Sequence, residues 1–231
     1  MTSWARGWVA LRDHPLLPLW TGLIPIVAIH ATYLVAASEG YVPWCFPYTD
    51  SCTSISATGR QGTGFILFKA TMLPYALVLG LYWHRSAAVL AALGDQPGWI
   101  STIRRTGTLA AVFLVVYVVA LGLAGDYLQL QRRIGIIFYF TLTAFAQLLF
   151  TARLQQCHVR DRTRLIHTGI CFAFLAIGLV SLLLDSLLDN YDDMEDAFEW
   201  TLALLMQCYF ITMYWTLRQP GLGIHPRREA Q

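Results

Sequence analysis

The sequence predicts an all-α membrane protein, a single domain over residues 1–231 built as a polytopic bundle of six transmembrane helices. Hydrophobic residues make up 56% of the chain and charged residues only 13%, so a water-facing surface could not be covered with polar groups. Apolar runs of about 20 residues, the length that crosses a bilayer core as a helix, also recur along the chain. Six such runs and their short loops account for nearly its whole length.

The long apolar runs place the six spans at residues 18–38, 65–84, 106–125, 134–152, 166–188 and 197–217. Strand-like alternation is absent and each run is longer than a barrel strand, so we expect helices to satisfy the backbone in lipid. Gln147 and Gln207 fall midway in the fourth and sixth spans. We expect these two side chains to hydrogen-bond between helices.

The distribution of Lys and Arg predicts that both chain ends are cytoplasmic. With this orientation the inner segments hold 12 of the 16 basic residues, in agreement with the positive charge that accumulates in cytoplasmic loops. Acidic residues gather on the opposite side, in the last outer loop at 189–196. The expected location is a bacterial inner membrane or a eukaryotic endomembrane or plasma membrane.

One sizeable loop, residues 39–64, is predicted on the outer side. Its aromatic residues, glycines and two cysteines favour an ordered structure. Because the outer compartment is oxidising, Cys45 and Cys52 are expected to form a disulfide. Six residues separate them, instead of the two of a redox motif, so a staple of the loop is favoured over a redox site.

Ionisable residues at membrane depth define the candidate site, because a charge inside a span is costly without a partner. His30, Lys69, Asp185 and Glu199 all fall in the outer half of the predicted bilayer. This clustering predicts a polar pocket that opens to the outer leaflet, where basic side chains pair with lipid phosphate. For Asp185 and Glu199 taken alone, the simpler interpretation is that each reaches water from its helix end. Outer residues that could join the pocket are Arg60, Asp126 and Arg132.

Several short motifs have counterparts in a known family. They are Phe-Pro-Tyr-Thr-Asp at 46–50 with Ser-Ile-Ser-Ala-Thr-Gly at 54–59, Phe-Ile-Leu-Phe-Lys-Ala at 65–70, Arg-Arg-Ile-Gly at 132–135 with Phe-Tyr-Phe at 138–140, and Phe-Glu-Trp at 198–200. Together they resemble the Frag1/DRAM/Sfk1 family, which includes the GPI-anchor remodelling protein of the Golgi and the N-terminal region of a yeast cell-wall protein that remodels anchors. The chain departs from that family at residues 61–64, which replace a Pro-Glu segment, and at Arg132 and Arg133, where a histidine is expected.

The resemblance implies that the chain binds lipid or glycolipid at the outer leaflet and remodels or redistributes it. In this hypothesis Arg60 and Lys69 hold an anionic headgroup, and Asp185 or Glu199 orients a hydroxyl group or acts as acid or base. Membrane lipids are the expected partners, and no cofactor is expected. Further residues expected to bind the substrate are Ser54, Ser56, Asp126 and His30.

Two other classes of function are open at this level. A non-catalytic scaffold or regulator would recruit a cytoplasmic protein or an anionic lipid through basic inner residues, whose ordinary role is to set orientation. A metal-dependent membrane hydrolase similar to the alkaline ceramidases would need convergent histidines, but the six present are scattered, so no metal is expected. The net charge of +2, spread over short segments, argues against nucleic acid. The basic inner residues are Arg153, Arg160, Arg162 and Arg164.

Overall fold

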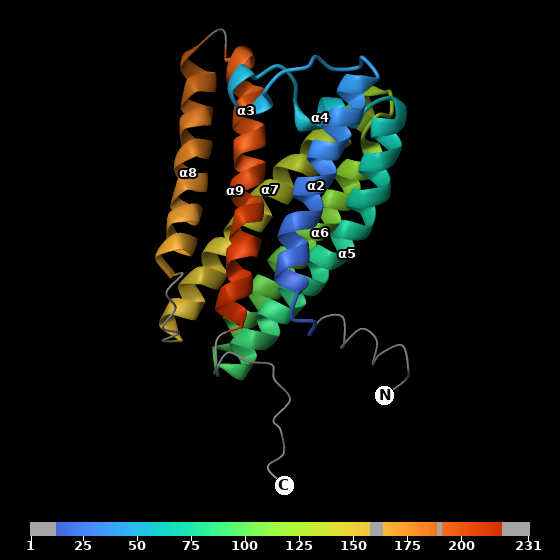
Figure 1. Cartoon of the computed structure of the whole chain (residues 1–231). Helices are drawn as coiled ribbons and strands as arrows, with labels where there is room; N and C mark the ends of the chain where they lie inside the picture. The colour runs from blue at the N-terminus through green and yellow to red at the C-terminus, as the bar shows by residue number, and fades with distance from the viewer. Residues whose placement is uncertain (1–12, 158–163, 189–190, 219–231) are drawn as a thin grey trace, which may run out of the picture.

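The computed structural model describes residues 13–157, 164–188 and 191–218 and places them in helices, with no strand in these ranges. Six long helices form one bundle, and two short helices lie across one end of it, which we call the loop end (Figure 1). The long helices are α2 (Leu17–Ser38), α5 (Gly62–Ala92), α6 (Pro97–Ala120), α7 (Asp126–Gln156), α8 (Arg164–Leu187) and α9 (Asp192–Leu217). The short helices are α3 (Pro47–Asp50) and α4 (Ile55–Thr58).

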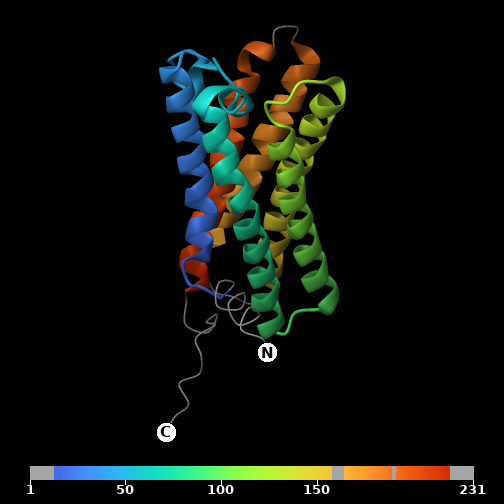
Figure 2. The same ribbon diagram turned by 90° about the vertical axis from the view of Figure 1, so that its right-hand side faces the viewer.

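The long helices are arranged as a closed ring. Each packs against the next along the chain, and α9 closes the ring by packing against both α8 and α2 (Figure 1, Figure 2). The α7–α8 contact is the narrowest of these and includes a hydrogen bond of 2.9 Å from Gln155 Nε2 to Thr168 Oγ1. A ring of helices encloses a central space, and side chains from five of its helices line the cavity described below.

Five of the described helices, α2, α5, α6, α7 and α8, are long and apolar enough to cross a membrane. The chain is therefore an all-α, multi-pass membrane protein. Helix α9 falls outside this group because acidic residues occupy its first turns, and Gln207 and three threonines interrupt its apolar stretch. Two of these polar side chains are nevertheless buried in the bundle, with Gln207 3% and Thr216 1% exposed. Helix α9 thus faces protein more than its composition alone suggests.

The helices differ from the predicted spans at several ends. Helix α5 begins three residues before the predicted 65 and continues to Ala92, and α7 begins at Asp126 instead of 134. The predicted spans end at charged or polar residues such as His84 and Arg133, whereas the helices continue past them. The predicted third span, 106–125, is wrong at its far end, because α6 stops at Ala120. Gly122 and Gly125 follow with φ of 76° and 123°, which turn the chain before α7.

Glycines allow neighbouring helices to approach closely. A Cβ atom on Gly135 of α7 would lie 2.7 Å from the backbone nitrogen of Tyr117 on α6. A Cβ on Gly22 of α2 would lie 2.8 Å from the carbonyl oxygen of Gln207 on α9. Small residues at such contacts are typical of helices that pack in a membrane.

Hydrogen bonds between α7 and α9 hold the centre of the bundle together. Gln147 Nε2 donates to the carbonyl oxygen of Met206 at 3.0 Å, and Thr151 Oγ1 lies 2.8 Å from the Tyr209 hydroxyl. Gln207 Nε2 lies 3.5 Å from the Tyr139 hydroxyl. The expectation that Gln147 and Gln207 bond between helices is confirmed.

We expect Gly135→Ala to destabilise the bundle, because its new methyl group meets the backbone of Tyr117 and no side-chain movement can relieve it. Overpacking of this kind costs about 1–3 kcal/mol. The matched control is Gly80→Ala on α5, where a Cβ meets nothing within 4 Å and helix propensity favours alanine. Thermal unfolding in detergent should show a lower midpoint for Gly135→Ala only, and equal midpoints would contradict this packing account.

Candidate functional site

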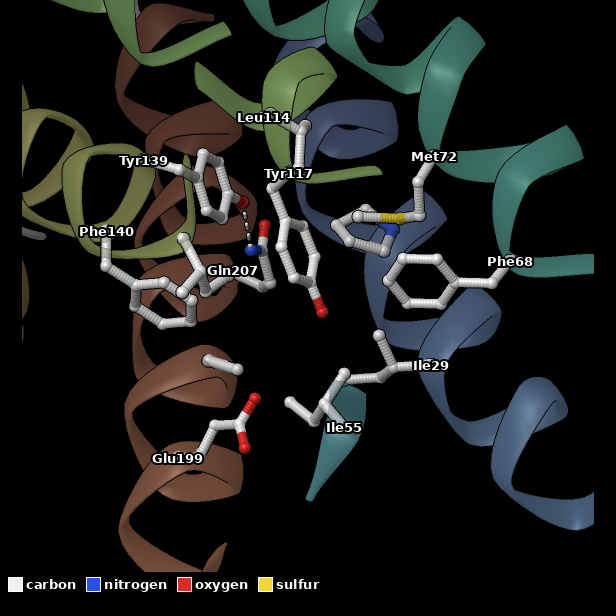
Figure 3. Close-up of a pocket in the computed structure, with 13 residues that line it drawn as sticks. Ile29, Ile55, Phe68, Met72, Leu114, Tyr117, Tyr139, Phe140, Glu199 and Gln207 are labelled. Carbon is white, nitrogen blue, oxygen red and sulfur yellow. Dashed lines mark hydrogen bonds between the residues drawn. The ribbon is translucent and has the colours of Figure 1, made fainter. Parts of the chain in front are cut away.

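A cavity lies within the half of the ring nearest the loop end, bounded by α2, α5, α6, α7 and α9 and covered by Ile55 of α4 (Figure 3). Its empty volume is about 410 Å³ when the open mouth is included. The smaller space that the centre of a water-sized molecule can occupy is about 30 Å³. Most of its wall is apolar. The polar side chains that line it are Tyr117, Tyr139, Glu199 and Gln207.

Glu199 contributes the acidic group of this lining. Its carboxylate lies across the cavity from the Tyr117 ring, which points its hydroxyl toward the same space (Figure 3). The backbone N–H of Ile55 lies close enough to the Glu199 carboxylate to stabilise its negative charge. No ion pair joins Glu199 to a basic side chain within the described ranges. Because a carboxylate offers about four acceptor positions, most of them are available to a molecule in the cavity.

Tyr117 offers a second free polar group. Its side chain is 2% exposed, and its hydroxyl has no hydrogen-bond partner among the described residues. Leaving a buried hydroxyl unpaired costs about 1–3 kcal/mol. Such a group in a folded protein calls for a partner that enters from outside, either water or a ligand. Tyr139 and Gln207, deeper in the cavity, instead pair with each other.

The short helix α4 brings three of the predicted site residues together above the cavity. Ser54 caps α4 by accepting a hydrogen bond of 3.0 Å from the Ala57 backbone N–H. Ser56 Oγ lies 3.1 Å from Ser54 Oγ and accepts a bond of 2.9 Å from the Arg60 guanidinium. Arg60 is exposed and close enough to act electrostatically on Glu199. Ser54, Ser56 and Arg60 are therefore linked by hydrogen bonds, and Arg60 connects them electrostatically to Glu199.

Arg132, near the start of α7, adds a second basic side chain to this end. It acts electrostatically on the Tyr117 hydroxyl, as Arg60 does. Two guanidinium groups thus lie near the polar part of the cavity, while Glu199 lies within it. At the same end, Asp196 and Glu195 act electrostatically on Glu199 more strongly than Arg60 does, so this end of the bundle carries charges of both signs.

The rest of the outer loop is bound to α2 and α9. The predicted disulfide between Cys45 and Cys52 is present, with Cα atoms 6.6 Å apart. His30 is engaged at both ring nitrogens, with the Ile26 carbonyl at 2.7 Å and the Tyr48 hydroxyl at 2.9 Å. His30 therefore holds the loop in place, and it does not line the cavity.

The structure does not bring Lys69 or Asp185 to Glu199, so the single pocket expected from these three residues is not formed. Lys69 Nζ donates to the Val119 carbonyl at 3.1 Å and lies 4.3 Å from the centre of the Phe65 ring. That carbonyl is near the end of α6, where the helix dipole attracts a cation. Asp185 is exposed on α8, whose apolar window is only 6% buried.

Asp126 is also separate from the cavity. It is the exposed first residue of α7, where an acidic side chain is favoured by the helix dipole. Its expected role in binding the substrate therefore has no geometric support. The predicted depth of Asp126 in the membrane suggested a position near the site, but its side chain is not part of the cavity wall.

Arg153, one of the basic residues considered for partner binding, is engaged within the protein. Its Nε donates to Asp95 Oδ2 at 3.0 Å, a second nitrogen bonds to Asp95 Oδ1, and its guanidinium lies 5.4 Å from the centre of the Trp99 ring. These hydrogen bonds lower the pKa of the Asp95 carboxyl. Arg160 and Arg162 lie outside the described residues, as does the side chain of Arg164.

Sequence reasoning missed Tyr117 and Tyr139. An aromatic residue in an apolar run is most often part of the core, so Tyr117 carried no signal beyond its hydroxyl, and Tyr139 stood out only through the Phe-Tyr-Phe motif at 138–140. The described residues hold no group of three or more side chains suited to bind a metal.

Comparison of the chain with protein-family models, with curated proteins and with solved structures finds no match. The resemblance to the Frag1/DRAM/Sfk1 family stays a prediction.

We expect Asp95→Asn to lower the midpoint of thermal unfolding by a few degrees near pH 7. The pKa of Asp95 is lowered in the folded protein from its ordinary value of 3.8, so the unfolded chain binds the proton more tightly. This contribution is full above about pH 4 and disappears as the pH falls through the lowered value.

The difference between the wild type and Asp95→Asn should therefore shrink as the pH is lowered from about 6 to about 3. Asp126→Asn, which alters an exposed carboxylate favoured only by the helix dipole, serves as the control and should lower the midpoint by less than Asp95→Asn does. A gap between the wild type and Asp95→Asn that stays constant over this range would contradict the assignment.

Proposed function

We propose that the chain is a six-span membrane protein that binds a lipid headgroup at the outer leaflet and redistributes or remodels that lipid. The observation that carries this proposal is a mostly apolar cavity in the bundle, with a carboxylate and an unpaired hydroxyl directed into it. Buried polar groups at membrane depth are costly and favour a functional explanation.

The arrangement of the helices supports the sixth crossing and the orientation. Helix α2 begins, and α9 ends, at the end of the bundle opposite the loop end (Figure 1). That end also carries the basic pair at the start of α6, Arg104 and Arg105, and Arg153 at the end of α7. The disulfide lies at the loop end, which suits an oxidising outer compartment. In this orientation the cavity belongs to the outer leaflet.

A sideways route into the cavity is favoured between α7 and α9. The hydrogen bonds between these two helices involve Tyr139, Gln147 and Thr151 of α7, all more than three turns from its start at the loop end. Beside the Tyr139–Gln207 bond, Ile136 and Phe140 of α7 line the cavity together with Ala203 of α9. Apolar walls on this side suit an acyl chain, while the polar groups further in suit a headgroup.

The polar groups have separate roles in this proposal. Arg60 and Arg132 hold the phosphate of the headgroup, because guanidinium groups pair with phosphate through charged hydrogen bonds. Glu199 and Tyr117 bind the part of the headgroup that reaches into the cavity. Lys69 and Asp185 have no role here, since neither lines the cavity.

The orientation predicts the outcome of reporter fusions. A phosphatase that is active only outside the cytoplasm should be inactive at the C-terminus and active when inserted after Leu123, between α6 and α7. A fluorescent protein that folds only in the cytoplasm should give the reverse pattern. Phosphatase activity at the C-terminus would contradict six crossings with both ends inside.

We expect Ala203→Phe to reduce the lipid that purifies with the protein several-fold, because the larger ring occupies the cavity. Ala203 is 6% exposed and lines the cavity. The matched control is Ala70→Phe, at an exposed position of α5 that does not line it. Native mass spectrometry gives the bound lipid per chain. Equal occupancy in both variants and the wild type would contradict the proposal and favour the scaffold hypothesis.

A further inference from the structure

The cavity also indicates the chemistry of the headgroup. We propose that it holds a primary ammonium group between Glu199 and Tyr117, so that the bound lipid is an aminophospholipid whose phosphate lies toward Arg60. This inference rests on the proposed function. It concerns the ligand class at the same site, and its failure can be told apart from failure of lipid binding.

Charge is the first argument. Glu199 directs a carboxylate into a mostly apolar cavity, and within the described ranges it forms no ion pair. The nearby Ile55 N–H supplies only a partial positive charge. A buried carboxylate is costly unless a cation compensates it. An ammonium group supplies that charge, whereas a neutral hydroxyl does not.

Hydrogen-bond geometry is the second argument. An ammonium group has three donors and no acceptor. The Glu199 carboxylate and the Tyr117 hydroxyl, which has no partner among the described residues, are acceptors directed into one space (Figure 3). The aromatic rings of Phe68 and Phe140 also line the cavity, and aromatic faces attract cations.

Size is the third argument, and it separates two common amine headgroups. The space that admits the centres of water-sized molecules is about 30 Å³, which is roughly two water positions. A CH₂–NH₃⁺ group fits such a space. A trimethylammonium group is much bulkier and has no N–H to donate, so the cavity discriminates against choline.

The position of Arg60 extends the site to the phosphate. One of its guanidinium nitrogens donates to Ser56, and a guanidinium carries five N–H donors in total. Because Arg60 is exposed and acts electrostatically on Glu199, an anion at Arg60 and a cation at Glu199 lie near each other. A phosphate joined to an ammonium by a two-carbon link carries this pair of charges.

The test is lipid binding by the purified full-length chain in detergent, followed by native mass spectrometry. The probes are phosphatidylethanolamine, phosphatidylcholine and phosphatidylglycerol with identical acyl chains. We expect phosphatidylethanolamine to bind on the order of tenfold more tightly than phosphatidylcholine. Glu199→Gln should remove this preference. Asp185→Asn, which alters an exposed carboxylate on α8 outside the cavity, should retain it.

Tyr117→Phe provides a second variant that keeps the ring and removes only the hydroxyl. It should reduce the preference for phosphatidylethanolamine less than Glu199→Gln does. If Glu199→Gln does not fold, Tyr117→Phe still tests the ammonium site. An unchanged preference in Tyr117→Phe would then overturn the ammonium site.

The remaining outcomes separate the two proposals. Equal binding of all three lipids by the wild type would overturn the ammonium site and leave lipid binding intact. Binding of none of them would overturn the proposed function itself. Soluble phosphoethanolamine should compete only weakly, and competition as potent as that of the lipid would show that the ligand is a free headgroup.

Discussion

The hydrogen bond from the Trp200 indole to the Thr53 carbonyl, 2.8 Å long, fixes the outer loop on the bundle. Trp200 is fully buried, and the rings of His30, Tyr33 and Tyr48 pack against it with centroids 5.4 to 6.0 Å away. Burial of an aromatic side chain with its one donor satisfied is strongly favourable. Because Thr53 directly precedes the cap of α4, this contact also places α4 over the bundle.

The same contact sets the rotation of α9. Successive residues on a helix are about 100° apart, so anchoring Trp200 toward α2 and the loop turns Glu199 toward the centre of the ring. Glu199, Ala203 and Gln207, spaced four residues apart, then form one stripe along the cavity wall. On the opposite wall, the close approach of Gly135 to Tyr117 positions the unpaired hydroxyl. Loop docking and glycine packing together create the site.

Hydropathy predicted the architecture of this structure. The all-α class, the multi-pass character and the disulfide followed from residue type and spacing. Ser54, Ser56 and Arg60 lie close together because they share one short loop. Rotation about each helix axis was not predictable in the same way. Lys69 is the neighbour of Phe68, and only Phe68 faces the cavity.

The central claim is that the cavity bounded by Glu199 and Tyr117 receives a lipid headgroup from the side. An experimental structure of the protein in a lipid bilayer disc tests it most directly. The account predicts headgroup density beside the Glu199 carboxylate, with an acyl chain that leaves between Ile136 and Ala203. A structure in which side chains fill that space, with Glu199 turned outward to water, would contradict it.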